Sequence, residues 1–226
     1  MRVIVVGLGG IGSNLVDALC RTILFSKSNK VSRKALLVDG DKYEAKNRER
    51  QRYTAFANKA EATKEWLKES FPELEIEARP QYIDSNNILF IREGDVVFLA
   101  VDNHATRRLV SDHIGTLDNA LLISGGNEEF DGNIQIYERR DGKDFTPPLT
   151  HLHPEIENPK DKNPAAINCG EAVVAGGVQL LAVNLKVASL MIEAFTLWLL
   201  SMDIPYTEVY ANIKTGNVRP AKRIVD

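Results

Sequence analysis

The chain has 226 residues, of which 44% are hydrophobic, and a formal net charge of -3 at pH 7. This length and apolar content suffice for one α/β domain with its own core, and the mild acidity gives no reason to expect nucleic-acid binding. Two cysteines, Cys20 and Cys169, are too few for a disulfide framework or for a structural zinc held by paired C-x-x-C hooks. We therefore expect no structural zinc and a cytoplasmic location.

The first predicted strand leads directly into a glycine-rich turn and a helix. Residues Val3 to Val6 are β-branched and apolar, which suits a parallel strand buried on both faces. Gly7, Gly9 and Gly12 follow with the G-x-G-x-x-G spacing, which lets the backbone turn tightly and approach a phosphate at a helix N-terminus. The pattern predicts a nucleotide site that includes these glycines and Gly10, although a merely structural tight turn has the same spacing.

The second apolar run, "ALLVDGD", ends at Asp39. An acid at the end of the second strand commonly binds ribose hydroxyls in nucleotide-binding folds. The alternative is an ordinary acidic residue in a turn after a strand. At this point the pattern fits a nicotinamide cofactor as well as ATP.

Strand-like and helix-like runs alternate through the first 126 residues. After residue 39 we expect a helix over about 58–70, strands over 73–80 and 94–102, a helix over 105–114 and a strand over 120–126. Alternation of this kind predicts right-handed crossovers in a Rossmann-like, doubly wound and mainly parallel sheet.

The remainder of the chain departs from this alternation. Residues 133–142 alternate apolar and polar side chains before an Asp-Gly turn, so together with residues 206–218 they predict an antiparallel extension of the sheet. Residues 143–168 contain five of the nine prolines and are expected to form a mobile loop. The apolar stretch at about 178–200 is interrupted by polar residues, which favours a buried helix over a membrane span.

Residues 37–53, "LVDGDKYEAKNRERQRY", carry a more specific pattern. They resemble the segment hVDxDxVExSNLxRQ of the ThiF/MoeB/HesA superfamily, which includes the ubiquitin-like-protein activating enzymes. The departures, Tyr43, Lys46 and Arg48, remove no charged group. The matching residues are Asp39, Asp41, Glu44, Asn47, Arg50 and Gln51.

The resemblance implies a single ThiF-type adenylation domain over residues 1–226, with a mobile crossover loop at about 143–168. Enzymes of this superfamily use ATP to adenylate the C-terminal carboxylate of a small β-grasp protein, which is a ubiquitin-like or a sulfur-carrier protein. The matches place Asn47 and Arg50 on the triphosphate, and Asp39 and Asp41 in the same nucleotide site.

Two further segments resemble the superfamily. Residues 59–72, "KAEATKEWLKESFP", are similar to the helix K-x-x-x-A-x-x-x-L-x-x-x-N-P, which implies that Lys59 also binds the triphosphate, with Lys64 as the alternative. Lys64 equally suits a solvated helix face.

Residues 94–107, "GDVVFLAVDNHATR", are similar to the superfamily pattern hhhCxDNxxxR. The similarity implies that Asp102 carries Mg²⁺ on the phosphates, that Asn103 shapes the nucleotide pocket and that Arg107 pairs with a carboxylate. An Asp-Asn pair after a strand is otherwise an ordinary helix cap.

Residues 167–188, "INCGEAVVAGGVQLLAVNLKVA", resemble the crossover segment that holds a cysteine. This implies Cys169 as the thioester nucleophile, although small buried cysteines are common, and Cys20 is expected in the core. His151 and His153 are interpreted as solvated loop residues, with assistance to Cys169 as the lesser alternative.

The resemblance covers nearly all of residues 1–140 and again 167–200. It implies a homodimer and a downstream conjugating protein, and we expect neither a nucleic acid nor a membrane as partner. The usual N-terminal extension with its finger arginine is not found before Val3, and the pattern is most similar to members of small bacterial ubiquitin-like operons, including the PRTRC type. An NAD-dependent oxidoreductase and a non-catalytic scaffold for a ubiquitin-like protein remain the alternatives.

Overall fold

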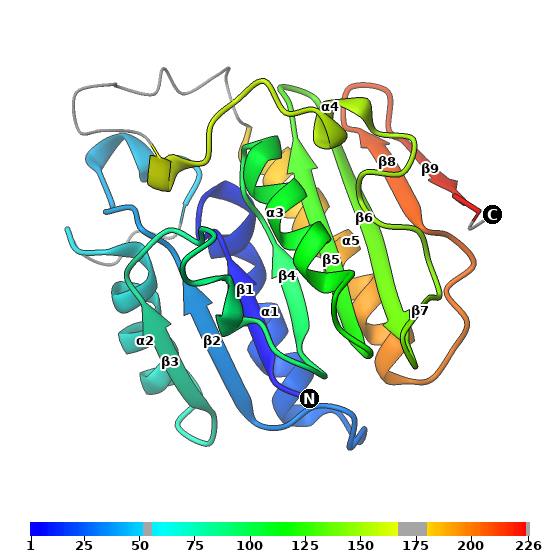
Figure 1. Cartoon of the computed structure of the whole chain (residues 1–226). Coiled ribbons are helices and arrows are strands. Elements are labelled where there is room, and N and C mark those ends of the chain that lie inside the picture. Colours follow the sequence, from blue (N-terminus) through cyan, green and yellow to red (C-terminus); the bar gives the residue numbers. More distant parts are fainter. Residues whose placement is uncertain (52–55, 167–179, 225–226) are drawn as a thin grey trace.

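A mixed sheet of nine strands forms the centre of this computed structural model, which describes residues 1–51, 56–166 and 180–224 (Figure 1). The strand order is β3-β2-β1-β4-β5-β6-β8-β9, and β7 pairs with β6. The parallel strands are β1 (Val3–Val6), β2 (Lys34–Val38), β3 (Glu75–Arg79), β4 (Val96–Leu99) and β5 (Ala120–Asn127). The antiparallel strands are β6 (Asp131–Arg140), β7 (Lys143–Asp144), β8 (Glu208–Asn212) and β9 (Asn217–Ala221). This arrangement confirms the predicted fold class.

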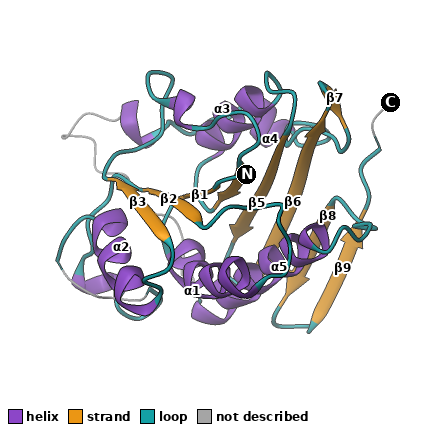
Figure 2. Cartoon of the chain, turned by 90° about the horizontal axis from the view of Figure 1, so that it is seen from below, coloured by secondary structure: helices purple, strands orange, loops and turns teal. Residues whose placement is uncertain are grey.

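Helices cover both faces of the sheet (Figure 2). One face is covered by α1 (Gly10–Phe25), α2 (Lys59–Ser70) and α5 (Leu181–Leu199), and the other by α3 (His104–Ile114) and the short α4 (Pro154–Glu157). Short 3-10 turns lie at Ala45–Asn47, Ile88–Phe90 and Pro164–Ala166.

The alternation of side chains along β1 explains its continuous apolar run. Val3 and Val5 belong to the hydrophobic cluster under α1 and α5, whereas Ile4 and Val6 belong to the cluster on the α3 side. Successive residues of a strand point to opposite faces, so a strand covered on both faces needs an apolar side chain at every position.

Helix α5 is long and apolar enough to cross a membrane by length and composition alone. Half of that apolar window is buried in this structure, and the helix packs against α1, β5 and β6. It therefore occupies the place that the sequence predicted, a buried helix against the sheet.

The segment expected to be a mobile loop contributes two side chains to the core. Leu149 and Ile156 are 0% and 2% exposed and belong to the cluster on the α3 side of the sheet. Residues 143–166 also include β7 and α4. Mobility of the segment stays a prediction, and residues 167 and 168 lie outside the described residues.

The turn after β1 depends on two glycines. Gly7 has a φ of +90°, and a Cβ there would lie 2.6 Å from the carbonyl oxygen of Ala100. A Cβ at Gly12 would overlap the carbonyl oxygen of Gly7. Because both obstacles are backbone atoms, neither moves aside without distorting the turn.

We therefore expect Gly12→Ala to lower the free energy of unfolding by about 1–3 kcal/mol, the usual cost of overpacking. Gly9→Ala is the matched control, because a Cβ at Gly9 would meet no atom within 4 Å. Thermal unfolding of both variants measures the effect, at roughly 2–4 °C per kcal/mol for a chain of this size. Equal melting temperatures for the two variants would contradict the close approach of Gly12 to Gly7.

Candidate functional site

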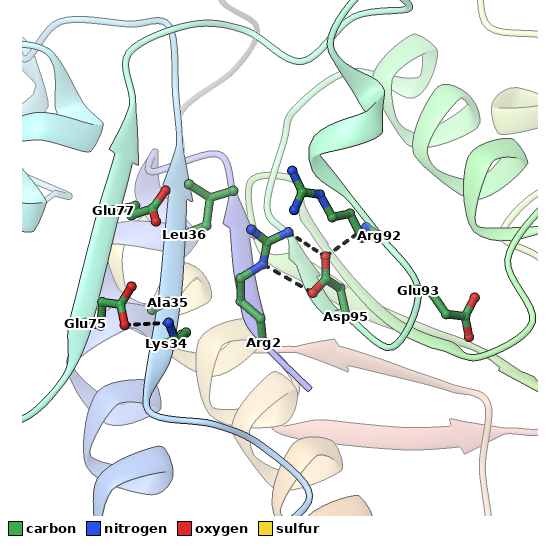
Figure 3. Close-up of a pocket in the computed structure, with 9 residues that line it drawn as sticks. All are labelled: Arg2, Lys34, Ala35, Leu36, Glu75, Glu77, Arg92, Glu93 and Asp95. Atoms are coloured by element: carbon green, nitrogen blue, oxygen red, sulfur yellow. Dashed lines mark hydrogen bonds and ion pairs between the residues drawn. The ribbon is translucent and has the colours of Figure 1, made fainter.

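Two hollows lie at opposite ends of the parallel strands. The smaller one, about 390 Å³, lies at their amino ends, and most of its charges pair within it (Figure 3). Arg2 binds Asp95 at 2.7 Å, and Lys34 binds Glu75 at 2.7 Å. The larger one is a cleft of about 1050 Å³ at the carboxyl ends, where open α/β sheets bind their ligands.

The cleft brings together nearly all of the predicted site residues. Gly12 lies beneath the turn and does not line it, Lys64 does not line it, and Cys169 lies outside the described residues. The predicted residues that do line it are Gly7, Gly9, Gly10, Asp39, Asp41, Glu44, Asn47, Arg50, Gln51, Lys59, Asp102, Asn103 and Arg107.

Asp39 joins the glycine turn to the loop after β2. Its carboxylate accepts hydrogen bonds from the backbone N–H of Leu8 at 2.5 Å and of Asp41 at 2.8 Å. The residue is 8% exposed, and burial raises its pKa to about 6, whereas the Lys59 charge acts to lower it. Asp39 thus shapes the cleft as well as lining it.

Lys59 is held on the cleft wall by Asp41. The Lys59 Nζ lies 2.9 Å from a carboxylate oxygen of Asp41, and the hydroxyl of Tyr82 donates to the other oxygen. Burial alone would raise the pKa of Asp41, but the Lys59 ammonium and the two hydrogen bonds hold it below its ordinary value. This network presents a buried ammonium group to the cleft at a defined position.

Two residues of this network were not predicted. The Asn58 side chain caps α2 by accepting from the N–H of Ala60, and its amide donates to the carbonyls of Asp39 and Asp41. For Asn58 the sequence did contain a signal, because an asparagine directly before a predicted helix indicates a helix cap. Tyr82 carries no such signal, because its contact with Asp41 spans 41 positions of the chain.

Asn47 and Arg50 come from the turn that follows β2. The Asn47 Oδ1 accepts a hydrogen bond from the N–H of Glu44 at 2.9 Å, which closes the turn, and Asn47 is 5% exposed. The carbonyl of Arg50 accepts from the Asn14 side chain of α1 at 3.1 Å. The backbone of this turn is therefore fastened to α1, beside the glycines.

The end of β4 supplies Asp102, Asn103 and Arg107. Asp102 is exposed and lines the cleft, whereas the Asn103 side chain caps α3 by accepting from the N–H of Thr106 at 2.8 Å. The helix-cap interpretation is therefore right for Asn103, which lines the cleft as well.

Arg107 is buried, and among the described residues its guanidinium forms no hydrogen bond with a carboxylate, the kind of partner that was predicted. Its guanidinium donates to the Ser124 hydroxyl at 2.9 Å and to the carbonyls of Val101 and Gly125 at 2.7 and 2.8 Å. Burial lowers the pKa of Arg107 to about 10, and the charge of Asp102 opposes that shift. Arg107 thus connects the end of β4 to β5, and it also lines the cleft.

The crossover segment is fastened to the same end of the sheet. The carboxylate of Asp161 accepts hydrogen bonds from the N–H groups of His104 at 2.7 Å and Ala105 at 2.9 Å, at the start of α3. Arg108 of α3 donates to the carbonyl of Glu157 at 2.7 Å. In Figure 1 this segment, in yellow, runs along the upper edge of the molecule past the start of α3.

His153 is not the solvated loop residue that the sequence suggested. Its Nδ1 lies 2.8 Å from Glu155 and its Nε2 lies 2.6 Å from Glu208. Glu208 also lies 2.8 Å from the Arg223 guanidinium and accepts from the Tyr210 hydroxyl at 2.9 Å. An ionised carboxylate only accepts hydrogen bonds, so both contacts are satisfied when each ring nitrogen of His153 carries a proton.

The surroundings of His153 favour its charged form. The hydrogen bond to Glu208 is the main cause that raises the pKa of His153 above its ordinary value, Glu155 adds to the rise, and burial opposes it. In its charged form the imidazole links the crossover segment to β8 through Glu208.

Comparison with known proteins gives one family. The sequence profile of the ThiF family matches residues 1–219. The protein named "Adenylyltransferase and sulfurtransferase MOCS3" is 29% identical to this chain in Culex quinquefasciatus and 32% identical in Drosophila yakuba, over 181 residues. Each match covers 78% of this chain and 37% or 36% of the relative, so the chain spans little more than a third of the relatives' length.

Solved structures share the fold. A crystal structure of E. coli MccB with ATP superposes with a TM-score of 0.71 at 17% identity, over 98% of this chain and 63% of that one. A crystal structure of PaaA gives a TM-score of 0.68 at 15% identity, over 98% of this chain and 63% of that one. At these identities the likeness shows the fold alone.

The His153 link generates a pH-dependent prediction. Its contribution to stability is fully present below the ordinary histidine pKa of 6.5 and is lost as pH rises through the raised pKa, because a neutral ring donates to only one carboxylate. At pH 6, His153→Gln is expected to lower the free energy of unfolding by about 1.5–3 kcal/mol. The loss should shrink toward pH 9.

Urea unfolding of the wild type and both variants at pH 6, 7, 8 and 9 measures this effect. His151→Gln in the same segment is the control, because the described residues show no side-chain hydrogen bond for His151. A loss for His153→Gln that stays constant over this pH range would contradict a charged link.

Proposed function

The chain belongs to the ThiF family, and from that premise we propose that it is an ATP-dependent adenylyltransferase that activates the C-terminal carboxylate of a small protein. One observation carries the proposal. Three separate loops bring a glycine turn, the basic residues Arg50 and Lys59 and the acid Asp102 into one cleft at the carboxyl ends of the strands. The adenylyltransferase name of the MOCS3 relatives and the MccB structures with ATP and with MccA support it.

The nucleotide would lie across the ends of β1, β2 and β4. The backbone of the glycine turn and the start of α1 would offer N–H groups to phosphates, and Asp39, which lines the cleft, would meet the ribose. Asn47, Arg50 and Lys59 line the adjoining wall, where the triphosphate would meet two cationic groups.

In the proposed reaction a carboxylate oxygen of the partner attacks the α-phosphorus of ATP. A new P–O bond forms as the bond to the β-phosphate breaks, so that an acyl adenylate and pyrophosphate result. Negative charge accumulates on the phosphate oxygens during this exchange. Fixed cations such as Arg50 and Lys59 stabilise that charge without reorganising.

Asp102 fits the predicted role of a magnesium ligand. It is an exposed carboxylate that lines the cleft, and carboxylate oxygen suits this hard cation. Within residues 1–51, 56–166 and 180–224 no group of three or more Asp, Glu, His or Cys side chains is placed to hold a metal. This fits an ion shared between one carboxylate and the phosphates, whose charge it would offset.

The proposed partner is a β-grasp protein of the ubiquitin-like or sulfur-carrier kind, and the proposed assembly is a homodimer. An oxidoreductase would use the glycine turn and Asp39 equally well. Hydride transfer gives no role to Arg50, Lys59 and Asp102, which line the same cleft. A scaffold without catalysis would need none of these three residues, so adenylation accounts for more of the site.

Thermal unfolding tests the nucleotide assignment without a partner. Mg-ATP at 100 times its dissociation constant should add about 2.7 kcal/mol, or roughly 5–10 °C, and NAD should add nothing. Arg50→Gln and Asp102→Asn should each lose most of the Mg-ATP shift, because each removes a charge proposed to face the phosphates. Lys64→Gln, outside the cleft, should keep it. A rise in melting temperature with NAD alone would contradict the proposal.

We further propose that the acyl group passes from the adenylate to the Cys169 thiolate, with release of AMP. Its support is the match of residues 167–188 to the crossover segment of the family. Cys169→Ser should retain pyrophosphate exchange with the partner protein and lose any conjugate that a thiol reductant cleaves. Such a conjugate on the serine variant would exclude Cys169 as the acceptor.

A further inference from the structure

Two asparagines are in contact beside the glycine turn, and the proposed nucleotide contacts use neither of them. Asn127 is the last residue of β5 and lines the cleft, and its Nδ2 donates to the Oδ1 of Asn184 at 3.0 Å. Asn184 belongs to α5, which packs against α1 and β5 (Figure 2). A Cβ at Gly10 would overlap the Asn184 amide, so this amide lies directly against the start of α1.

Asn184 is a polar residue at a core position. It is 0% exposed, and its neighbours Val183, Val187 and Ala188 on the same helix are buried in the hydrophobic cluster. The Asn184 Nδ2 is buried and has no hydrogen-bond partner among the described residues. A buried donor without an acceptor costs free energy, so stability does not account for an asparagine here. Its one hydrogen bond fixes the orientation of the Asn127 amide at the edge of the cleft.

The geometry of the proposed reaction gives a direction to the attacking carboxylate. The leaving pyrophosphate would lie with Arg50 and Lys59 in the segment after β2, and the α-phosphate would lie on the glycine turn after β1. The attacking and leaving oxygens of such a displacement lie roughly in line. The carboxylate would therefore approach from the other side, over β4 and β5. Of the β5 residues that line the cleft, Gly126 and Asn127, only Asn127 has a side chain that donates hydrogen bonds.

We propose that Asn127 is a catalytic residue whose amide donates a hydrogen bond to the attacking carboxylate, and that Asn184 is the residue that positions this amide. The proposal rests on the proposed function, which sets the place of the α-phosphate. One carboxylate oxygen forms the bond to phosphorus as the bond to the β-phosphate breaks, and the other becomes the acyl carbonyl oxygen. Asn127 uses one of its two N–H groups on Asn184 and the other on this second oxygen.

The hydrogen bond needs an acyl group, so Asn127 should affect the binding of an acyl adenylate and leave the binding of AMP and Mg-ATP unchanged. A stable probe is 5′-O-(N-acetylsulfamoyl)adenosine, which has a sulfamate in place of the phosphate and carries an acyl carbonyl beside it. Its acetyl group includes no other part of a partner protein, so contacts elsewhere in the cleft do not contribute.

Isothermal titration calorimetry of the full chain measures the dissociation constants of the probe, AMP and Mg-ATP. Asn127→Ala should weaken binding of the probe by at least about tenfold and change the other two constants by less than about twofold, because only the probe accepts the lost hydrogen bond. Asn184→Ala should show the same selectivity. The double variant should bind the probe no more weakly than Asn127→Ala, because Asn184 acts through Asn127.

The control Asn217→Ala removes an exposed amide of β9, outside the cleft, and should leave all three dissociation constants unchanged. Thermal unfolding of each variant shows that it is folded. Should Asn184→Ala fail to fold, Asn184→Leu tests the same position with a side chain of similar shape, and Asn127→Ala tests the catalytic residue independently.

The three ligands separate a catalytic role from a structural one. Equal weakening of the probe, AMP and Mg-ATP in Asn127→Ala would indicate a damaged glycine turn and overturn the proposal, as would unchanged binding of the probe. Additive losses in the double variant would overturn the positioning role of Asn184. Tight binding of Mg-ATP and of the probe that Asn127→Ala leaves unchanged would support adenylation while refuting Asn127. Binding of none of the three ligands to the wild type would refute the proposed function and this proposal with it.

Discussion

The buried carboxylate of Asp39 is the interaction on which the cleft depends. It accepts the N–H of Leu8 from the glycine turn and the N–H of Asp41 from the next loop, so that one side chain holds both walls of the nucleotide end. Burial of a carboxylate is costly unless hydrogen bonds compensate, and here it raises the pKa to about 6 in spite of Lys59. The two loops therefore keep their shape together, and the Lys59 ammonium is held beside them by Asp41.

The parallel and antiparallel strands of the sheet form different parts of the cleft. Parallel strands bring their carboxyl ends to one edge, which collects the glycine turn and Asp102, and Arg107 connects two of those ends. The antiparallel strands β6 and β8 extend the floor beyond that edge with a row of polar side chains. The crossover segment crosses this edge. Its Asp161 accepts a hydrogen bond from the start of α3, and its His153 contacts Glu208 of β8. One contact is with the start of α3 and the other is with β8, so the segment bridges these two elements.

Local patterns predicted more of the parallel half than of the antiparallel half. The glycine turn, the acids after β2 and the cap at Asn103 depend on neighbours within a few positions, and the structure has each where the spacing placed it. The prediction of a solvated side chain was wrong for His153, whose partner Glu208 is 55 positions away. The hydrogen bonds of Arg107 to Ser124 and Gly125, across a strand pair, were not predicted. The contacts of Asp161 and Tyr82 were not predicted for the same reason, because the local sequence around an isolated acid or tyrosine does not indicate a distant partner.

The amino-acid sequence by itself determined the family, the fold class and the residues that gather at the nucleotide end. Strand periodicity, glycine spacing and short motifs express constraints between residues that are close along the chain. Only the tertiary structure decided that the cleft continues across β6 and β8, and that its lysine and arginine side chains in the described part of the chain, apart from Arg107, come from residues 42–59. It also decided that His153 contacts Glu208 of β8. Those features arise from the pairing and packing of strands far apart in the sequence, which bring together side chains that no local pattern relates.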